Sequence, residues 1–241
     1  MEYDYVIIGS GFFGSTAAER LSCGGYSVLV IDKNDHVGGS CHTYVDENTN
    51  VIVHKYGPHI FHTNSEKVWR YITRFAKFNN YQHKVYSCHN DHLYLFPPNL
   101  MMLNAFFKKK YTPQDAERFF NANKLLYENP KNAEEKAISL VGHELYKAFY
   151  YGYTKKQWNA EPIDLPAETI SRIPVYYDLQ TNYFLDKYQG IPIGGYTPIF
   201  QCMLHKCDVW LDYDYFDHID EIRSIAKFII YSGPIDRFYN Y

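Results

Sequence analysis

The sequence lacks the features that mark disulfide-rich, metal-binding, membrane-spanning and nucleic-acid-binding proteins. Its 5 cysteines are odd in number and never spaced as C-x-x-C, so neither a disulfide framework nor a zinc site is indicated. No apolar stretch reaches the roughly 18 residues of a membrane span, and the first residues enter a strand without a signal sequence. The formal net charge of -3 comes without a basic stripe that would favour nucleic acid. We therefore expect a soluble, cytoplasmic protein.

A glycine motif follows the first apolar run, Tyr5–Ile8, and has the form G-x-G-x-x-G. In such a motif Gly9 permits a tight turn, Gly11 lets the backbone approach a pyrophosphate, and Gly14 lets a helix pack closely on the strand. The helix predicted from Ser15 to Cys23 would point its amide-rich end at the phosphates. Strand, glycines and helix in this order predict a dinucleotide site rather than an idle turn.

An acidic residue, Asp32, ends the second apolar run, Val28–Ile31. A carboxylate there can accept hydrogen bonds from a ribose diol and would repel a 2'-phosphate. The paired Gly38 and Gly39 beyond it suggest a second close approach of backbone to the cofactor, which is more expected of FAD than of NAD. Taken by themselves, the two glycines are also compatible with a plain turn.

Histidines gather between His54 and His62, and His59 lies three residues before His62. A metal site would need a third ligand at good spacing, and none lies nearby. A histidine that faces the cofactor or substrate is the favoured interpretation, and a surface loop with incidental histidines is the alternative.

The middle of the chain is mostly helical. A capping box, Thr63-x-x-Glu66, predicts a helix, and two short strands are expected around the turn at Asn90 and Asp91. The basic run Lys108–Lys110 is typical of a helix end. Two further helix starts are indicated by capping residues. They lie at Thr112-Pro113 and at Asn132 with Glu135.

The segment Gly152–Trp158 places hydroxyls, an amide and an indole after a predicted helix end. This composition is typical of a surface that stacks on a nucleobase or sugar, although a Trp that anchors a helix end is an equal alternative. Further on, Arg172 falls in an expected loop, where it would bind a diphosphate bidentately or remain a solvated surface residue.

The last fifty residues return to α/β patterning. A glycine loop at Gly190–Tyr196 precedes a helix that reaches Leu204, and Asp208–Leu211 and Lys227–Tyr231 are expected strands. We expect them to rejoin the amino-terminal sheet. The predicted fold is α/β: a discontinuous Rossmann-like FAD-binding domain with an inserted helical domain and a small antiparallel sheet. Its predicted parts are residues 1–78 and 190–241 for the FAD-binding domain, 79–98 and 171–189 for sheet segments, and 99–170 for the helical insertion.

The sequence resembles the bacterial-type UDP-galactopyranose mutases over its whole length. The motifs that carry the resemblance occur in the family's order. They are Gly9–Gly14, Gly38-Gly39, the His54–His62 block, Gly152–Trp158, Arg172–Val175, Asn182-Tyr183-Phe184, Gln189–Thr197 and Gly233–Asp236. The resemblance implies an isomerase that interconverts UDP-galactopyranose and UDP-galactofuranose through an adduct of reduced FAD and the sugar, without net redox change.

The resemblance also implies roles for particular residues. FAD would be contacted by Gly9, Gly11, Phe12, Phe13, Gly14, Asp32, Lys33, Gly38, Gly39, Ser40, His59, Ile60 and Val209. The UDP-sugar would be contacted by His83, Tyr153, Thr154, Trp158, Arg172, Asn182 and Tyr183. Two of these would act in catalysis: His59 beside the flavin ring, and Arg172 on a loop that closes over the diphosphate. No metal is implied.

Family members continue for well over a hundred residues beyond the position of Tyr241. The resemblance therefore implies that a second diphosphate-binding Arg, phosphate-binding tyrosines and a closing flavin-binding strand lie outside this sequence. Activity of this chain alone is doubtful on that ground, and a homodimer or a second chain with the remaining part are the partners to consider. The alternatives are a non-catalytic or split-gene FAD- or UDP-binding remnant and an amine-oxidase-type FAD oxidoreductase.

Overall fold

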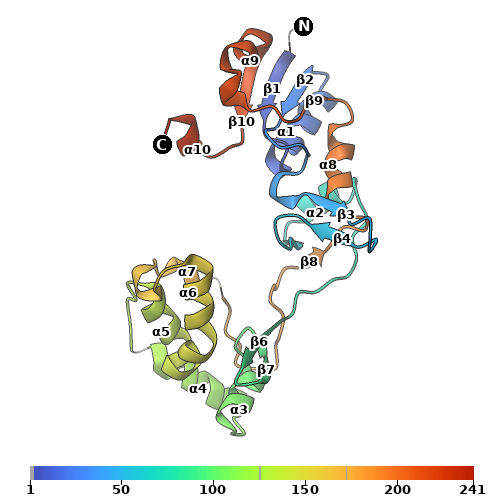
Figure 1. Cartoon of the computed structure of the whole chain (residues 1–241). Helices are drawn as coiled ribbons and strands as arrows, with labels where there is room; N and C mark the ends of the chain where they lie inside the picture. The colour runs from blue at the N-terminus through green and yellow to red at the C-terminus, as the bar shows by residue number, and fades with distance from the viewer. Residues whose placement is uncertain (1–2, 125, 172) are drawn as a thin grey trace. The chain divides into compact units, whose positions relative to one another are not determined.

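The computed structural model describes residues 3–124, 126–171 and 173–241 (Figure 1). It divides the chain into two compact units. Unit 1 combines Met1–Tyr81 with Asp186–Tyr241, and unit 2 is Gln82–Leu185. Both ends of the chain thus build unit 1, and unit 2 is an insertion within it. The finer division proposed from the sequence, at residues 78, 98, 170 and 189, stays a prediction.

A parallel sheet forms the centre of unit 1, with the spatial order β10-β1-β2-β9. Its strands are β1 (Tyr3–Ile8), β2 (Val28–Ile31), β9 (Asp208–Trp210) and β10 (Ala226–Tyr231). The two central strands are almost wholly apolar, as expected of strands covered on both faces. The predicted α/β fold with a discontinuous Rossmann-like domain is therefore confirmed.

Helices cover both faces of this sheet. Side chains alternate along each strand, so β1 and β2 present apolar side chains to both faces. Ile7 and Val30 pack with Leu204 on the side of α1 (Phe12–Cys23) and α8 (Thr197–Leu204). Val6 and Leu29 pack on the opposite face with α9 (Ile219–Ile225). Burial of these apolar side chains fixes the sheet and leaves the carboxyl ends of its strands free to position a site.

Shorter elements complete unit 1. Two antiparallel pairs are β3 (Thr43–Val45) with β4 (Ile52–His54), and β5 (Phe61–Thr63) with β8 (Tyr188–Gly190). The helices are α2 (Glu66–Ile72), α10 (Ile235–Phe238) and the 3-10 turns η1 (Gly39–Cys41) and η4 (Tyr215–Asp217).

The predicted cap of α2 was wrong by two residues. Ser65, not Thr63, is the N-cap, and its hydroxyl accepts a hydrogen bond from the amide of Val68 at 3.4 Å. Thr63 instead accepts from the amide of Ser65 at 3.0 Å. The helix begins later because β5 extends through Thr63 and needs it in extended backbone.

Unit 2 is a helical bundle next to one hairpin. The hairpin is β6 (Val85–His89) with β7 (His92–Phe96). The helices are α3 (Leu100–Phe107), α4 (Pro113–Lys124), α5 (Ala133–Leu145), the π-helical turn η2 (Tyr146–Tyr151), α6 (Gly152–Trp158), the 3-10 turn η3 (Pro162–Asp164) and α7 (Glu168–Ser171). Their shared core is buried around Leu103, Phe120, Ile138, Leu145 and Tyr150.

The helix signals of unit 2 are largely confirmed. The Asn132 side chain accepts from the amide of Glu135 at 2.9 Å, Thr112 accepts from the amide of Asp115, and Lys108 ends α3 in left-handed backbone with φ 52°. The prediction that Gly152–Trp158 follows a helix end was wrong. The π-helical turn carries the chain from α5 into α6 without a break, so this segment is itself helical.

Candidate dinucleotide-binding site

A cavity of about 280 Å³ lies where the carboxyl ends of β1, β2 and β10 meet in unit 1. In open parallel sheets this is the edge at which nucleotides bind. We call it the glycine-loop cavity. Six residues predicted to contact the cofactor line it: Gly9, Gly11, Asp32, Lys33, Gly39 and Ser40.

The three motif glycines meet different constraints. Gly9 has φ +101°, and a Cβ on Gly14 would lie 1.8 Å from the carbonyl oxygen of Gly9. Side chains at these two positions are therefore excluded by the fold itself. A Cβ on Gly11 would meet no protein atom within 4 Å. The protein does not require glycine there, so the bare backbone of Gly11 fits a site that a dinucleotide diphosphate approaches closely.

The paired glycines after β2 form the next part of the cavity. The amide of Gly38 donates to the carbonyl of Ser10 at 3.1 Å, so the two glycine-bearing turns are joined directly. A Cβ on Gly39 would lie 3.4 Å from the Cα of Gly11. Gly38 and Gly39, the second place at which we expect backbone to approach the cofactor, therefore lie beside Gly11, the first such place.

Asp32 is 5% exposed and uses both carboxylate oxygens within the protein. One oxygen accepts from the amide and hydroxyl of Ser10, at 2.8 and 2.6 Å, and the other accepts from the amide and side chain of Asn34, at 3.0 and 2.9 Å. Four accepted bonds are about the capacity of a carboxylate. Asp32 therefore anchors the glycine loop, and its predicted bond to ribose requires a ribose hydroxyl to replace one of these donors.

The opposite wall was missed in the sequence. It comes from the segments that follow β9 and β10, and it includes Tyr213, Asp214, Phe216, Ser232 and Arg237. The signal was available, because these residues directly follow strands expected to join the same parallel sheet. Their carboxyl ends had to meet the glycine loop.

An ion pair closes this wall. The Arg237 guanidinium donates to Asp214 at 2.8 Å and lies 4.5 Å from the centre of the Phe216 ring. Burial favours a raised pKa for Asp214, but the hydrogen bonds from Arg237 and from the amide of Phe216 outweigh it and hold the pKa below its ordinary value. The wall therefore presents a cation that is already paired.

Seven residues predicted to contact the cofactor lie outside the lining of this cavity: Phe12, Phe13, Gly14, Gly38, His59, Ile60 and Val209. Phe12 packs its ring against Phe200 at 4.8 Å, Phe13 is 65% exposed, and Val209 lines another hollow together with Leu211. The Val209 side chain faces the core between the sheet and α8. The contacts of Phe12, Phe13 and Val209 with the cofactor stay predictions.

The predicted catalytic His59 is half-buried in the loop between β4 and β5. Its ring Nδ1 lies 2.9 Å from the carbonyl of Gly57, and its amide donates to Nδ1 of His54 at 3.3 Å. Burial, and then the neighbouring His59, lower the pKa of His54, so His54 is neutral and can accept this bond. Ile60 is half-buried next to it. The flavin-facing role of His59 stays a prediction.

The residues predicted to contact the sugar nucleotide belong to unit 2. The His83 ring meets the Tyr183 ring edge-on at 5.2 Å, and the carbonyl of Asn182 accepts from the Tyr176 hydroxyl at 2.9 Å. On α6, Thr154 is buried. Tyr153 is 68% exposed and Trp158 54% exposed, so Trp158 does not anchor the helix end in the core.

We call His83, Tyr153, Trp158 and Tyr183 the aromatic group. The predicted Arg172 lies outside the described residues.

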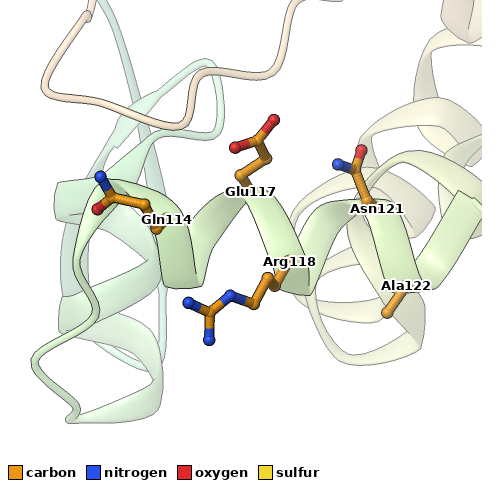
Figure 2. A pocket seen from close by; sticks show the side chains of 5 residues that line it. All are labelled: Gln114, Glu117, Arg118, Asn121 and Ala122. Carbon is orange, nitrogen blue, oxygen red and sulfur yellow. The ribbon is translucent and has the colours of Figure 1, made fainter.

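A larger hollow, on α4, is unrelated to any motif: its lining side chains project from this single helix (Figure 2). They are Gln114, Glu117, Arg118, Asn121 and Ala122.

Within the described ranges, no three His, Cys, Asp or Glu side chains are grouped so that they could hold a metal ion. Over the same residues, no helix is long and apolar enough to cross a membrane.

A parallel sheet whose first strand runs into a G-x-G-x-x-G turn and a cavity defines a Rossmann-type dinucleotide-binding protein. Comparison with known families agrees, since residues 7–75 match the model of the NAD(P)-binding Rossmann-like domain. Residues 148–241 match the model of the UDP-galactopyranose mutase family.

Curated relatives extend this match. The chain is 37% identical over 242 residues to a dTDP-fucopyranose mutase of Escherichia coli, and 38% identical over 238 residues to a probable UDP-galactopyranose mutase of Klebsiella pneumoniae. Each alignment covers 98% of this chain but only 64% and 62% of the relatives. The chain is thus related to the UDP-galactopyranose mutases over nearly its whole length, and it spans less than two thirds of the length of these relatives.

A solved structure shows the same fold. The crystal structure of a reduced UDP-galactopyranose mutase superposes with a TM-score of 0.64 at 19% identity. The match covers 94% of this chain and 48% of that one.

Proposed function

We propose that this chain is the cofactor- and substrate-binding part of a mutase that interconverts UDP-galactopyranose and UDP-galactofuranose. The observation that carries the proposal is the presence, in one chain, of the glycine-loop cavity and of a mutase-family match over residues 148–241. That match includes Tyr153, Trp158 and Tyr183, the residues predicted to contact the substrate. A cytoplasmic location is part of the same proposal.

The dinucleotide we infer is FAD. The bare backbone of Gly11 next to Gly39 suits its diphosphate, and the amides at the start of α1 offer hydrogen bonds and the positive end of the helix dipole. When bound, reduced FAD supplies the nucleophilic ring nitrogen that the family's chemistry requires. The protein's own part is then binding, orientation and electrostatics.

The residues of the chain divide this work between the units. In unit 1, Asp32 holds the glycine loop through Ser10, and Arg237 holds the opposite wall through Asp214. In unit 2, the aromatic group offers flat faces for a base or sugar. We infer that Arg172 supplies charge to the substrate diphosphate, as the family resemblance implies.

The test begins with the purified chain and FAD. We expect a yellow protein with bound flavin absorbance, and conversion of UDP-galactofuranose under dithionite once a polypeptide that corresponds to the remaining third of the relatives is supplied. A colourless protein that stays inactive with that polypeptide contradicts the proposal. Size-exclusion chromatography of the mixture and of the chain alone distinguishes a two-chain complex from a homodimer.

Gly11→Val provides a matched variant for the cofactor site. Gly11 has φ -70°, which any residue adopts, and free space around its Cβ position, so the fold should remain intact. The added side chain would project towards the diphosphate, and FAD affinity should fall at least about tenfold. Unchanged FAD affinity would mean that Gly11 does not face the cofactor.

The sugar nucleotide itself has a second candidate. The Escherichia coli relative is named for dTDP-fucopyranose and is nearly as similar as the relative named for UDP-galactopyranose. Both substrates belong in the same assay, with the rate on each deciding between them.

A further inference from the structure

One buried polar atom of unit 2 lacks a partner. Among the residues that the structure describes, the hydroxyl of Tyr150 is the one buried side-chain oxygen or nitrogen without a hydrogen bond. The side chain is 2% exposed. Buried hydroxyls nearly always have a partner, because desolvation without one costs free energy. The Tyr150 hydroxyl is therefore a donor that a bound group can use.

Tyr150 lies at an unusual place in the backbone. It belongs to the π-helical turn η2, which leads directly into Tyr153 and Thr154 of α6. π-helical turns are rare and occur frequently at functional sites, because the extra residue re-aims the side chains around it. The backbone irregularity and the unpaired hydroxyl are independent observations at one position.

The neighbours of Tyr150 are aromatic. Its ring lies 5.6 Å from that of Phe96, and Tyr183 is partly buried against the same core. Burial, and then Tyr183, raise the pKa of Tyr150 far above its ordinary value, so the hydroxyl keeps its proton at neutral pH. Tyr183 in turn meets His83 edge-on. The unpaired donor is thus close to Tyr183, one of the rings predicted to contact the nucleotide, and Tyr183 in turn contacts a second, His83.

We propose that the Tyr150 hydroxyl reads the pyrimidine base of the sugar nucleotide by donating a hydrogen bond to its O4 carbonyl, an inference that rests on the proposed function. O4 lies on the edge of the base opposite the glycosidic bond, which points away from the sugar and the diphosphate. Uracil and thymine both carry O4, whereas cytosine carries an amine there. Against cytosine the hydroxyl's own hydrogen stays unpaired, so cytidine nucleotides bind more weakly.

Binding requires the base to reach a hydroxyl that is covered. Residues 173–187, which include Tyr183, contain no helix or strand. A segment held by few backbone hydrogen bonds can shift to admit a flat ring more readily than the flanking helices.

Tyr146 offers a matched control on the same π-helical turn. It is 4% exposed, and its hydroxyl donates to Glu134 at 2.6 Å. Tyr146→Phe therefore removes a paired hydroxyl, and Tyr150→Phe removes an unpaired one, from equally buried rings in one turn. The two variants separate loss of an internal bond from loss of a ligand bond.

The experiment measures UDP and CDP binding by calorimetry, and thermal unfolding, for the full chain and both variants. The wild-type protein should bind UDP about tenfold more tightly than CDP. Tyr150→Phe should weaken UDP binding by about the same factor, bring the two affinities together and leave the unfolding midpoint equal or higher. Tyr146→Phe should lower the midpoint and leave the UDP-to-CDP ratio unchanged.

Two outcomes would overturn the inference. Equal binding of UDP and CDP by the wild-type protein does so without any variant, and so does an unchanged ratio in Tyr150→Phe. Flavin absorbance and conversion of UDP-galactofuranose are measured separately, so a protein that passes those tests but shows either outcome retains the proposed function and loses only the role of Tyr150.

Discussion

The residues around the glycine-loop cavity are tied to one another, whereas much of the aromatic group stands apart from the core. In unit 1, Asp32 alone accepts four hydrogen bonds, and Gly14 leaves no room for a side chain. In unit 2, Tyr153 and Trp158 are more than half exposed on α6. The difference teaches that in unit 1 the cavity and the fold depend on the same atoms, while in unit 2 side chains predicted to contact the ligand can be replaced without disturbing the core.

The largest expected effect is that of Gly14→Val. A side chain at this position would overlap the carbonyl oxygen of Gly9, and neither the strand nor the helix can move away without losing its packing. We expect a destabilisation of more than about 3 kcal/mol, seen as loss of soluble, folded protein by circular dichroism. Gly11→Val is the control, since its side chain meets no protein atom within 4 Å. A well-folded Gly14→Val protein would show that the close packing at Gly14 is not needed for the fold of unit 1.

Asp32→Ala should have the next largest effect. It removes the acceptor for Ser10 and Asn34 and leaves a buried hydroxyl and amide unpaired, at a cost of about 3 kcal/mol in the free energy of unfolding. Urea denaturation measures it. Asp35→Ala, on a side chain that is 68% exposed, should change this free energy by less than about 0.5 kcal/mol. Equal effects of the two substitutions would show that the hydrogen bonds to Asp32 are dispensable.

Glu19 on α1 should give unit 1 an acid-dependent stability. A hydrogen bond from Arg20, against the opposing effect of burial and with help from Tyr71, lowers the pKa of Glu19 to about 2. Because the folded pKa lies below the ordinary value of 4.5, this contribution is present above pH 4.5 and is lost as the pH falls towards 2.

Glu19→Gln should therefore flatten the fall of the unfolding free energy between pH 4.5 and 2, measured by urea denaturation across that range. Glu66→Gln, which breaks the exposed pair with Arg70, is the matched control and should leave the profile as it is. Parallel profiles for the wild-type protein and Glu19→Gln would contradict the prediction.

The smallest effect on stability is expected in unit 2. Trp158→Ala should change the free energy of unfolding by less than about 0.5 kcal/mol, because the indole is 54% exposed. If the aromatic group binds the sugar nucleotide, the same substitution should weaken UDP binding by about tenfold. Calorimetry measures the UDP affinity, and urea denaturation measures the free energy of unfolding, on the same preparation. A large loss of stability would show that the indole holds the fold, as Asp32 does in unit 1.

Prediction from the sequence succeeded where the determinants lie close together in the chain. The strand, glycine turn and helix from Tyr3 to Cys23 are local, and so are the caps at Thr112 and Asn132. The prediction failed at Gly152, where a helix end was expected. The π-helical turn that joins α5 to α6 has no sequence period that marks it, and because of this turn the chain continues as a helix through Gly152–Trp158.

Residues that line the cavity were missed for a different reason. Asp214 and Arg237 are about two hundred positions from Gly9, and they reach its cavity because β9 and β10 lie in the same parallel sheet as β1. The side chain of Val209 packs towards the core beside α8, and its predicted contact with the cofactor stays a prediction.

The sequence by itself determined the kind of site, because a glycine turn between a strand and a helix can be recognised from a few adjacent residues. It also determined the relationship to the mutases, which rests on several motifs in order. Only the tertiary structure decided that the oxygens of Asp32 are bonded within the protein and that Tyr150 has no partner. Hydrogen-bond partners and burial depend on which distant segments pack together, and no local pattern of residues specifies them.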